Sequence, residues 1–301
     1  MAITGERAAW ARMAADLGRG ARVRRVRKLG GGLVSDVFAV ALDGAPFDRV
    51  VVKRFRPDDD YGDAALEWEC LEFAQRVPLP APKQIALDES GEWFGTPALA
   101  MTFLPGSADV LPRKLDDWLR QLALAMATIH ATDIDGASGA LVRASEVETW
   151  EKPNFRAGPL VPRSIAAIDA QMPRSGWPPV LIHGDFHPGQ TVWQRGRLSG
   201  VVDWGDLVIG PRWYEVAYCR ADVTFLYGME AADRLLDHYV AITGLEPVDL
   251  AAFDLMCGMN ARQWGHRFLI AYREQGRTDT MRQFAARLAP FNRRALAELA
   301  G

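Results

Sequence analysis

The segment His183-Gly184-Asp185-Phe186-His187-Pro188-Gly189-Gln190, followed by Val201-Val202-Asp203-Trp204-Gly205-Asp206, is the most informative part of this sequence. It offers one carboxylate, Asp185, that can orient or accept a hydroxyl proton, and two oxygen donors, Gln190 and Asp203, that can hold a nucleotide-bound Mg²⁺. Phosphoryl transfer requires this division of roles, because its catalysis depends mainly on positioning and charge neutralisation. The pattern therefore indicates a kinase-type active site.

Local sequence predicts how the two metal ligands meet. Residues 191–194 and 198–204 are rich in β-branched and aromatic residues and flank a turn glycine, so we expect a β-hairpin. With a three-residue loop between the strands, Gln190 faces Val202 and lies diagonally beside Asp203. The hairpin therefore gathers the proposed ligands at its base.

These two motifs resemble those of the aminoglycoside phosphotransferase family, a branch of the protein-kinase-like fold that phosphorylates small molecules. The order of features matches over nearly the whole chain. The resemblance implies that Asp185 is the catalytic base and Asp203 a Mg²⁺ ligand, with Gln190 where the family usually has Asn. Because Gln is one methylene longer than Asn, we expect the second metal position to be shifted or weakened.

A nucleotide-binding kinase also needs a glycine-rich turn, a strand lysine and a helix glutamate. Residues 26–42 contain a strand, a glycine turn and a second strand, and we expect Gly31, Gly32 and Ser35 to contact the nucleotide. Glycines allow backbone N–H groups to approach phosphate oxygens closely. The spacing departs from both the protein-kinase loop and the usual pattern of the resembled family.

The lysine and the glutamate are expected on the next two elements. Residues 49–55 form a β-branched strand that ends near Lys53, with Arg54 on the opposite face. The resemblance implies that Lys53 contacts the α- and β-phosphates. Residues 64–74 have helical spacing, and the family pattern falls on Glu67 as the partner of Lys53. A solvated surface charge is the alternative for each residue.

The expected fold is α+β, a protein-kinase-like two-lobe fold with a small N-terminal antiparallel sheet and one main helix, then a larger, mainly helical lobe. We place the nucleotide-binding lobe at residues 1–104 and the catalytic and substrate-binding lobe at 105–301, because a Pro-Gly-Ser break follows Leu104. The resemblance implies backbone contacts from Met101 and Phe103 to the base of the cofactor, ATP or GTP.

Apolar spacing predicts a leading helix at residues 4–17 and long helices in the larger lobe. The latter span residues 113–131, 214–226, 231–242, 250–272 and 280–299. His130, near the end of the first of these, reads as a satisfied core or surface histidine. Residues 136–162 are poorly periodic and indicate a loop or insertion beside the substrate cleft.

Composition limits the partners. The chain has 301 residues, 49% of them hydrophobic, and a formal net charge of −3, so it lacks the basic surface that nucleic-acid binding requires. Three widely spaced cysteines predict reduced thiols in a cytoplasmic protein. No apolar run approaches the roughly 18 residues of a membrane span. Oligomeric state is not indicated.

Other interpretations remain for parts of the main motif. His183 reads as structural, whereas His187 either reaches a phosphate or caps the turn that follows it. A zinc hydrolase built on both histidines and Asp185 leaves Pro188-Gly189 and Asp203 without a role, which disfavours it. A protein kinase is disfavoured because no Ala-Pro-Glu segment follows the second motif. A nucleotide-binding protein without catalysis stays open.

The sequence leaves the small-molecule hydroxyl acceptor open among antibiotics, sugars, amino alcohols and macrolide-like compounds. Residues 205–301 carry 12 acidic residues and 11 arginines, so the lobe as a whole does not indicate a polycation site. Aromatic residues suggest a partly aromatic pocket instead, although such residues are more often core. They are Trp204, Trp213, Tyr214, Tyr218, Phe225, Tyr227 and Trp264.

Overall fold

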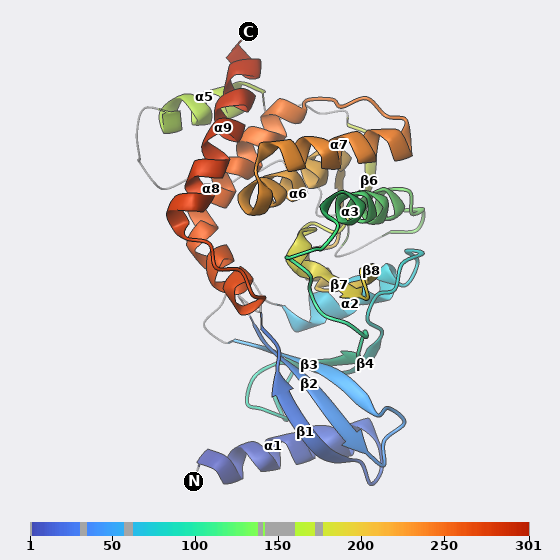
Figure 1. Cartoon of the computed structure of the whole chain (residues 1–301). Coiled ribbons are helices and arrows are strands. Elements are labelled where there is room, and N and C mark those ends of the chain that lie inside the picture. Colours follow the sequence, from blue (N-terminus) through green and yellow to red (C-terminus); the bar gives the residue numbers. More distant parts are fainter. Residues whose placement is uncertain are drawn as a thin grey trace.

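The computed structural model describes residues 2–30, 35–56, 63–137, 141, 160–171 and 177–300. The chain forms a small N-terminal lobe built on one sheet and a larger, mainly helical lobe stacked on it (Figure 1). This is the predicted α+β arrangement. Gly31 and Gly32 lie outside the described residues, as does most of the segment 136–162.

The smaller lobe contains a five-stranded antiparallel sheet with the order β1-β2-β3-β5-β4. The strands are β1 (Arg22–Lys28), β2 (Ser35–Asp43), β3 (Arg49–Phe55), β4 (Gln84–Asp88) and β5 (Ala98–Thr102). Two helices accompany them, α1 (Ala2–Leu17) and α2 (Ala64–Ala74). The strands predicted within residues 26–42 and at 49–55, and both predicted helices of this lobe, are confirmed.

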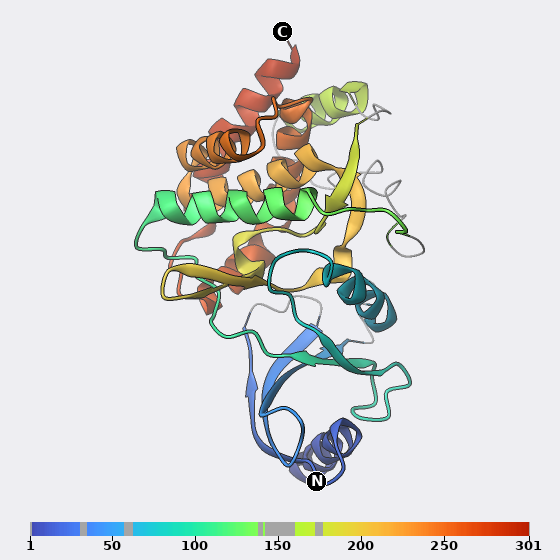
Figure 2. The same cartoon turned by 90° about the vertical axis from the view of Figure 1, so that its right-hand side faces the viewer.

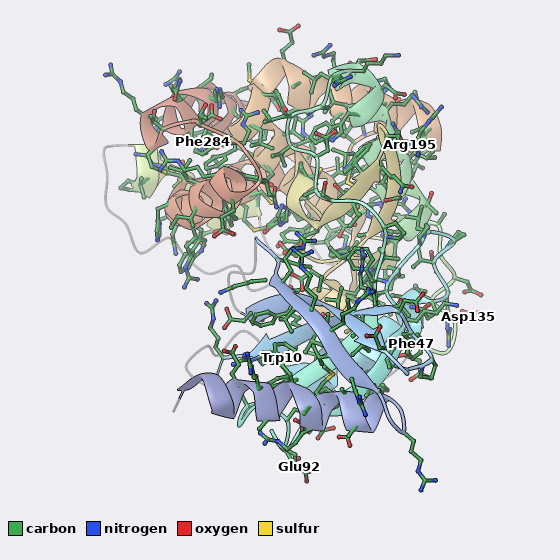
Figure 3. All side chains as sticks on the ribbon, turned by 60° about the horizontal axis from the view of Figure 1, so that its bottom comes forward. Trp10, Phe47, Glu92, Asp135, Arg195 and Phe284 are labelled. Carbon is green, nitrogen blue, oxygen red and sulfur yellow. The ribbon has the colours of Figure 1, made fainter. Side chains whose placement is uncertain are left out.

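Alternation along β3 divides its side chains between two environments. Val50 and Val52 are buried with Trp10 of α1, which lies where that helix meets the sheet (Figure 3). Arg54 shares this face, with its guanidinium stacked on Phe94 at 4.9 Å. Lys53 points to the other face, toward α2 and the larger lobe. The predicted opposite orientations of Lys53 and Arg54 are confirmed, because strand side chains alternate.

The larger lobe is dominated by helices whose predicted positions are confirmed to within a few residues. They are α3 (Leu115–His130), α6 (Arg212–Tyr227), α7 (Met229–Thr243), α8 (Leu250–Glu274) and α9 (Met281–Ala300). One further helix, α5 (Leu160–Gln171), was not predicted, and it begins inside the segment expected to be a loop. Short elements lie between α5 and α6. These are β6 (Pro179–Ile182), η2 (Pro188–Gln190), β7 (Thr191–Gln194), β8 (Arg197–Val201), η3 (Trp204–Asp206) and β9 (Val208–Pro211).

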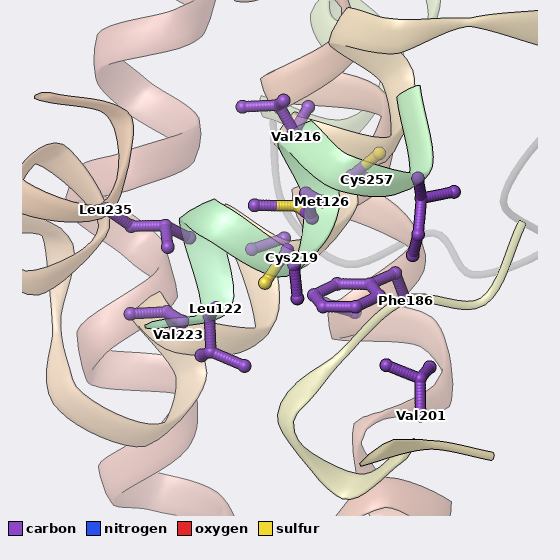
Figure 4. Packing of buried hydrophobic residues seen from close by; sticks show 14 of the residues in the cluster. Leu122, Met126, Phe186, Val201, Val216, Cys219, Val223, Leu235 and Cys257 are labelled. Carbon is purple, nitrogen blue, oxygen red and sulfur yellow. The ribbon is translucent and has the colours of Figure 1, made fainter. Parts of the chain in front are cut away.

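The core of the larger lobe lies between α3 and the helices that follow it. Leu122 and Met126 of α3 pack with Cys219 of α6 and with Phe186 (Figure 4). Phe186 belongs to the loop of residues 183–187, which is called the catalytic loop because it carries the candidate catalytic residue Asp185. All three cysteines of the chain are buried, and none of them forms a disulfide bond. Within the described ranges, no helix has both the length and the apolar character needed to cross a membrane.

The β7–β8 hairpin corrects one prediction and confirms another. Its loop has two residues, Arg195 and Gly196, both with positive φ, rather than the three expected. Such a pair suits the type I′ turn that matches strand twist. A bulge after Val192 then adds one residue to β8, which restores the register. Gln190 therefore faces Val202 as predicted, with the Val202 N–H donating to the Gln190 carbonyl at 2.9 Å.

The linker from the sheet passes this hairpin on its way to α3 (Figure 2). Ser107 and Trp193 exchange two backbone hydrogen bonds, of 3.2 and 2.8 Å. Gly106 has φ +123°, and a Cβ there would collide with the carbonyl of Trp193, so only glycine fits. The linker is thus attached to the strand that follows the catalytic loop. The division of the lobes at residues 104 and 105 stays a prediction.

Candidate active site

Lys53 lies at the centre of a buried ion-pair group at the junction of the lobes. Its ammonium donates to Glu67 Oε2 at 2.6 Å and to Asp203 Oδ1 at 2.5 Å. Lys53 is 6% exposed and Glu67 2% exposed. The strand, the helix and the loop that carry these residues are far apart in sequence, so the fold brings the predicted lysine, glutamate and metal ligand together.

The charges of this group depend on one another. Burial disfavours the ammonium of Lys53, but Asp203 and Glu67 outweigh burial and raise its pKa. Burial raises the pKa of Glu67, and the charge of Asp203 adds to that rise while Lys53 opposes it. For Asp203 burial is outweighed by Lys53, so its pKa is lowered. Lys53 and Asp203 therefore form a charged pair at neutral pH.

The backbone holds Asp203 in an unusual conformation. Its φ and ψ are 64° and 62°, in the left-handed region that non-glycine residues seldom adopt. Trp204 is fully buried directly after it and donates from Nε1 to the carbonyl of Val201 at 2.9 Å. Helix α2 packs closely on this turn. A Cβ added to Gly205 would lie only 3.4 Å from Glu67 Oε2. Backbone strain of this kind is common at functional sites.

Gln190 links the two aspartates of the main motif. Its Nε2 donates to Asp185 Oδ2 and to Asp203 Oδ2, both at 2.9 Å. Asp185 also accepts from the hydroxyl of Tyr218 at 2.6 Å. The amide nitrogen, not the oxygen, faces the carboxylates, which differs from the orientation expected for a metal ligand. The three side chains converge as the hairpin prediction requires.

These residues fit a Mg²⁺ ion. The Gln190 amide is in direct contact with the Asp203 carboxylate, and a half-turn of the amide would place Oε1 instead of Nε2 beside it. In the described part of the chain, no three His, Cys, Asp or Glu side chains form a metal cluster. Mg²⁺ is usually held by one or two protein oxygens together with phosphates and water, so this donor set is sufficient.

His187 lies on the far side of Asp185. Its Nε2 is 3.6 Å from Asp185 Oδ2, and its Nδ1 is 3.1 Å from Asp222 Oδ2 and from the Tyr272 hydroxyl. Burial disfavours the charged ring, but Asp185 and Asp222 raise its pKa to about 10. The Gly189 N–H also points at Nδ1, at 3.1 Å. The neutral ring accepts from Gly189, whereas the charged ring donates to Asp222.

His187 in turn affects the catalytic candidate. Burial works against the charged form of Asp185, but the charge of His187 and hydrogen bonds from His187, Tyr218 and Gln190 hold its pKa well below the usual range. Asp185 is therefore ionised at neutral pH. It can orient a hydroxyl group, and it is a weak base.

Buried polar groups support the loop before Asp185. His183 Nε2 lies 3.0 Å from the carbonyl of Val202, which ties this loop to the end of the hairpin and supports the structural role expected of His183. The Gly184 N–H donates to Glu215 Oε1 at 2.8 Å. Glu215 Oε2 lies 2.9 Å from His130 Nε2, and both side chains are fully buried. His130 is thus a satisfied core histidine, as expected.

A cavity of about 420 Å³ opens beside Asp185, between α6 and α8. Its polar lining includes Asp185, Asp206, Asp222 and Asn260. Its aromatic lining is Tyr214, Tyr218, Trp264 and Phe268. Of the aromatic residues proposed from sequence, Tyr214, Tyr218 and Trp264 therefore line a pocket, whereas Trp204, Trp213 and Phe225 are buried core residues.

The remaining nucleotide-site candidates lie along the same junction. Ser35 is buried at the start of β2, opposite Phe55, two residues beyond Lys53 on β3. Met101 is buried in β5, between β3 and β4. Phe103 follows the end of β5, with the Arg49 guanidinium 4.6 Å from its ring.

Sequence reasoning did not single out Glu215 or Asp222, and it expected Tyr218 only as part of an aromatic pocket, not as a partner of Asp185. Glu215, Tyr218 and Asp222 follow one another at 3- and 4-residue spacing on α6, so they share the helix face that meets the catalytic loop. Polar residues within an otherwise apolar stripe were the available signal. Asp206 belongs to the quoted motif, and the fold places it beside Gly184 of the other motif, which spacing along the sequence does not indicate.

Residues 25–251 match the phosphotransferase enzyme family. Among curated proteins, the chain is similar to the homoserine kinase of Allorhizobium ampelinum, with 29% identity over 194 residues, 60% of this chain and 59% of that one. The homoserine kinase of Bartonella henselae is 26% identical over 225 residues, 66% of each chain. The chain thus spans less than two thirds of the length of these curated relatives.

Solved structures share the fold. A candidate aminoglycoside phosphotransferase from Ralstonia eutropha JMP134 has a TM-score of 0.67 at 16% identity, over 99% of this chain and 98% of that one. The macrolide 2′-phosphotransferase type I has a TM-score of 0.62 at 18% identity, over 99% and 97%. A ternary complex of aminoglycoside phosphotransferase APH(4)-Ia with AMP-PNP and hygromycin B has a TM-score of 0.63 at 18% identity, over 92% and 97%. These likenesses confirm the kinase-like two-lobe fold.

Proposed function

Because the chain belongs to the phosphotransferase enzyme family, we propose that it transfers the γ-phosphate of ATP or GTP to a hydroxyl group of a small molecule. The observation that carries this proposal is the convergence of Lys53, Glu67, Asp203 and Asp185 at the junction of the lobes. They come from four separate segments. The structural neighbour that holds AMP-PNP together with hygromycin B supports a nucleotide and a small-molecule acceptor as the two ligands.

Asp185 is the proposed catalytic residue. The acceptor hydroxyl oxygen attacks the γ-phosphorus while the bond to the β-phosphate oxygen breaks, and the hydroxyl proton passes to Asp185. Because the neighbours of Asp185 keep its pKa low, it first orients the hydroxyl group and takes the proton late, when the new O–P bond has made that proton acidic. The Tyr218 hydroxyl, which donates to the other carboxylate oxygen, fixes the direction of this contact.

Mg²⁺, when bound, neutralises charge on the phosphates. Asp203 and Gln190 are the proposed ligands, and the longer arm of Gln190 leaves the second metal position weaker than a shorter amide would. Lys53, oriented by Glu67, is proposed to contact the α- and β-phosphates. Gly31, Gly32 and Ser35 are proposed phosphate contacts, and Met101 and Phe103 are proposed to contact the base through their backbone groups. The base itself, adenine or guanine, stays open.

The test is an acceptor panel assayed for ADP or GDP release. We expect the wild type to phosphorylate at least one small-molecule alcohol and Asp185→Asn to lower turnover by about 10²- to 10⁴-fold while it still binds Mg²⁺-nucleotide. Asp203→Ala should lose productive metal binding instead. Asp237→Asn removes the same charge from an exposed position on α7 and serves as the control. Equal turnover in Asp185→Asn and the wild type would refute the role of Asp185.

A non-catalytic nucleotide-binding protein is the second candidate. It is favoured by Gln190, whose amide nitrogen bridges the two carboxylates that a catalytic site needs free. Binding of Mg²⁺-nucleotide with no product from any acceptor would support this alternative.

Residues 1–104 and 105–301 remain our proposed lobes. A cytoplasmic location remains part of the proposal, supported by three buried cysteines that form no disulfide bond.

A further inference from the structure

The end of helix α8 contacts the smaller lobe beside the nucleotide candidates. A Cβ added to Gly30 would lie 2.9 Å from Glu274 Oε2, 3.2 Å from its Cβ and 3.7 Å from its Cδ, so both the stem and the carboxylate of Glu274 lie against this glycine. Glu274 is the last residue of α8, and Gly30 follows strand β1 by two residues. Helix α8 therefore reaches across the junction of the lobes (Figure 1).

Gly30 lies next to the strands that carry Lys53. The N–H of Leu29, directly before it, donates to the carbonyl of Val37 at 2.8 Å. Val37 of β2 faces Lys53 of β3 in the register of the sheet. In the sequence, Gly30 directly precedes the two glycines proposed as phosphate contacts. A change in the position of Gly30 is therefore expected to move the backbone groups that are proposed to hold the phosphates.

The same end of α8 also contacts the catalytic loop and the turn after it. The Tyr272 hydroxyl lies 3.1 Å from Nδ1 of His187. A Cβ added to Gly189 would lie 3.7 Å from Nε2 of Gln275. Residues two positions apart on a helix do not share a face, so Tyr272 meets the larger lobe while Glu274 meets the smaller one. One helix end thus contacts the neighbours of the proposed catalytic residue and those of the proposed phosphate contacts.

A buried arginine anchors the turn that follows α8. Arg277 is 8% exposed. Its guanidinium donates to the carbonyl of Leu226, near the end of α6, at 2.7 Å and to the carbonyl of Val110, in the linker from the sheet, at 3.3 Å. It also pairs with Asp279 at 2.7 Å. These buried bonds hold the end of α8 against the larger lobe and the linker, so Glu274 is presented to Gly30 from an anchored support.

We propose that Glu274 is a positioning residue for the nucleotide: it fixes Gly30, and with it the donor phosphates, relative to the catalytic loop. This inference rests on the proposed function. Phosphoryl transfer requires the donor phosphorus and the acceptor oxygen to be held at a set distance and direction, although the groups that hold them belong to different lobes. The end of α8, which contacts both Gly30 and His187, sets that distance.

A double-mutant cycle on the contact tests the inference. Glu274→Ala removes the side chain, and Gly30→Ala adds a Cβ that collides with it. Each change should raise the KM and the Kd for Mg²⁺-ATP about 10-fold while the KM for the acceptor stays unchanged. In the combined variant, the carboxylate that the added Cβ would meet at 2.9 Å is gone. That variant should therefore bind Mg²⁺-ATP as well as Glu274→Ala alone does.

Two further variants are the controls. Glu274→Gln keeps the stem and one oxygen, so it should bind Mg²⁺-ATP within about twofold of the wild type. Glu246→Ala makes the same truncation at an exposed position between α7 and α8, and should leave both KM values unchanged. A lower KM for ATP in Glu274→Ala would show that the carboxylate opposes the phosphates, and would overturn the inference. Additive losses in the cycle, or equal losses in the KM for ATP and for the acceptor, would refute it as well.

A disulfide bond between the two positions tests the contact directly. Gly30→Cys combined with Glu274→Cys places two Cβ atoms 3.2 Å apart, and disulfides need about 3.5 to 4.5 Å, so a small shift allows the bond. We expect oxidation of this variant to tighten Mg²⁺-ATP binding about 10-fold, because a covalent link replaces the lost contact. Weaker binding after oxidation, or no disulfide between the two positions, would contradict the proposal.

Binding measurements separate this inference from the proposed activity. Calorimetric titration with Mg²⁺-ATP needs no acceptor. If the wild type releases no product with any acceptor, the proposed phosphotransfer fails, and the Kd values across the cycle still support or refute the role of Glu274. A wild type that binds neither Mg²⁺-ATP nor Mg²⁺-GTP would refute both proposals.

Discussion

Some side chains at the junction of the lobes each form hydrogen bonds or ion pairs with two partners at once. Lys53 bonds to Glu67 and Asp203, and Gln190 bonds to Asp185 and Asp203. Removing one such group leaves its partners buried without compensation, which costs far more than a surface charge does. The need for buried, mutually compensating partners explains the residue types at these positions, and these residues already stood in the sequence motifs.

Asp206 differs from these residues, because no described hydrogen bond or ion pair holds its carboxylate and the charge of Lys53 only partly offsets its burial. Desolvation in the cavity and the charges of Asp185 and Asp203 raise its pKa to about 7. In the unfolded chain its pKa is near 3.8. The folded state therefore holds this proton more tightly, and stability falls as the pH rises from about 4 to about 7.

From this we predict that Asp206→Asn stabilises the protein in a pH-dependent way. Without Mg²⁺ and nucleotide, its melting temperature should exceed that of the wild type by a few degrees at pH 8 and by less at pH 5, because Asn resembles the protonated acid. Partial exposure to solvent keeps the effect small. The measurement is thermal unfolding at the two pH values. An equal difference at both pH values would contradict the raised pKa.

Helix α6 makes three polar contacts with the loop that carries Asp185. Glu215, Tyr218 and Asp222 lie on one face and contact Gly184, Asp185 and His187 in turn. The helix begins directly after β9, so few residues separate it from the metal-ligand turn. A helix that bears three polar contacts at a fixed spacing therefore helps to fix the position of Asp185, the proposed catalytic residue.

We predict that Glu215→Leu destabilises the protein by about 3 kcal/mol, because the Gly184 N–H and His130 both lose a buried partner. Its turnover should fall while its KM for ATP stays near that of the wild type, since the nucleotide candidates lie on other elements. Glu215→Gln keeps an oxygen for Gly184 and should lose less of both quantities. Urea unfolding and steady-state kinetics measure the two effects. A Leu variant within about 1 kcal/mol of the wild type would contradict this role.

For the β7–β8 hairpin, the sequence predicted the correct position of Gln190 opposite Val202 but the wrong loop length. The expected three-residue loop is a two-residue turn, and a bulge adds the missing residue. Gln190 faces Val202 in both cases. A bulge depends on contacts of the whole strand, whereas the alternation of side chains is set by neighbouring residues.

The larger lobe is joined by a buried charge network in addition to its apolar core. Arg220 of α6 bonds to both carboxylate oxygens of Asp254 on α8, at 3.1 and 2.9 Å, and to the carbonyl of Ala232 on α7 at 2.8 Å. Arg294 of α9 pairs with Asp233 of α7 at 2.7 Å. Helices α6, α7, α8 and α9 are therefore connected through the Arg220 guanidinium and its neighbours.

We predict that Arg220→Leu lowers the free energy of unfolding by about 3 to 5 kcal/mol, because Asp254 is left buried without its partner. The exposed pair of Arg120 and Asp117, at 2.8 Å on α3, provides the control. Arg120→Leu should cost under about 1 kcal/mol, since solvent screens that pair. Chemical denaturation of both variants makes the comparison. Similar losses in the two would show that the buried network adds no specific stability.

The active site exists only where the two lobes meet. Lys53 and Glu67 come from the smaller lobe, and Asp185, Gln190 and Asp203 come from the larger one. Helix α2 packs on the turn after Asp203, and Cys70 Sγ lies 3.8 Å from the carbonyls of Gly205 and Leu207. A shift of one lobe against the other would separate Lys53 from Asp203.

The amino-acid sequence by itself determined the elements and the candidates for the chemistry. Helices, strands and turns follow from patterns among adjacent residues, and Asp185, Asp203, Lys53 and Glu67 stood in recognisable motifs. Only the tertiary structure decided that Asp206 has no described partner and that the walls of the cavity are acidic and aromatic. Those properties depend on which faces of α6 and α8 meet. Such packing brings together residues from separate segments, and the periodicity of side chains within one helix or strand does not indicate which of them will meet.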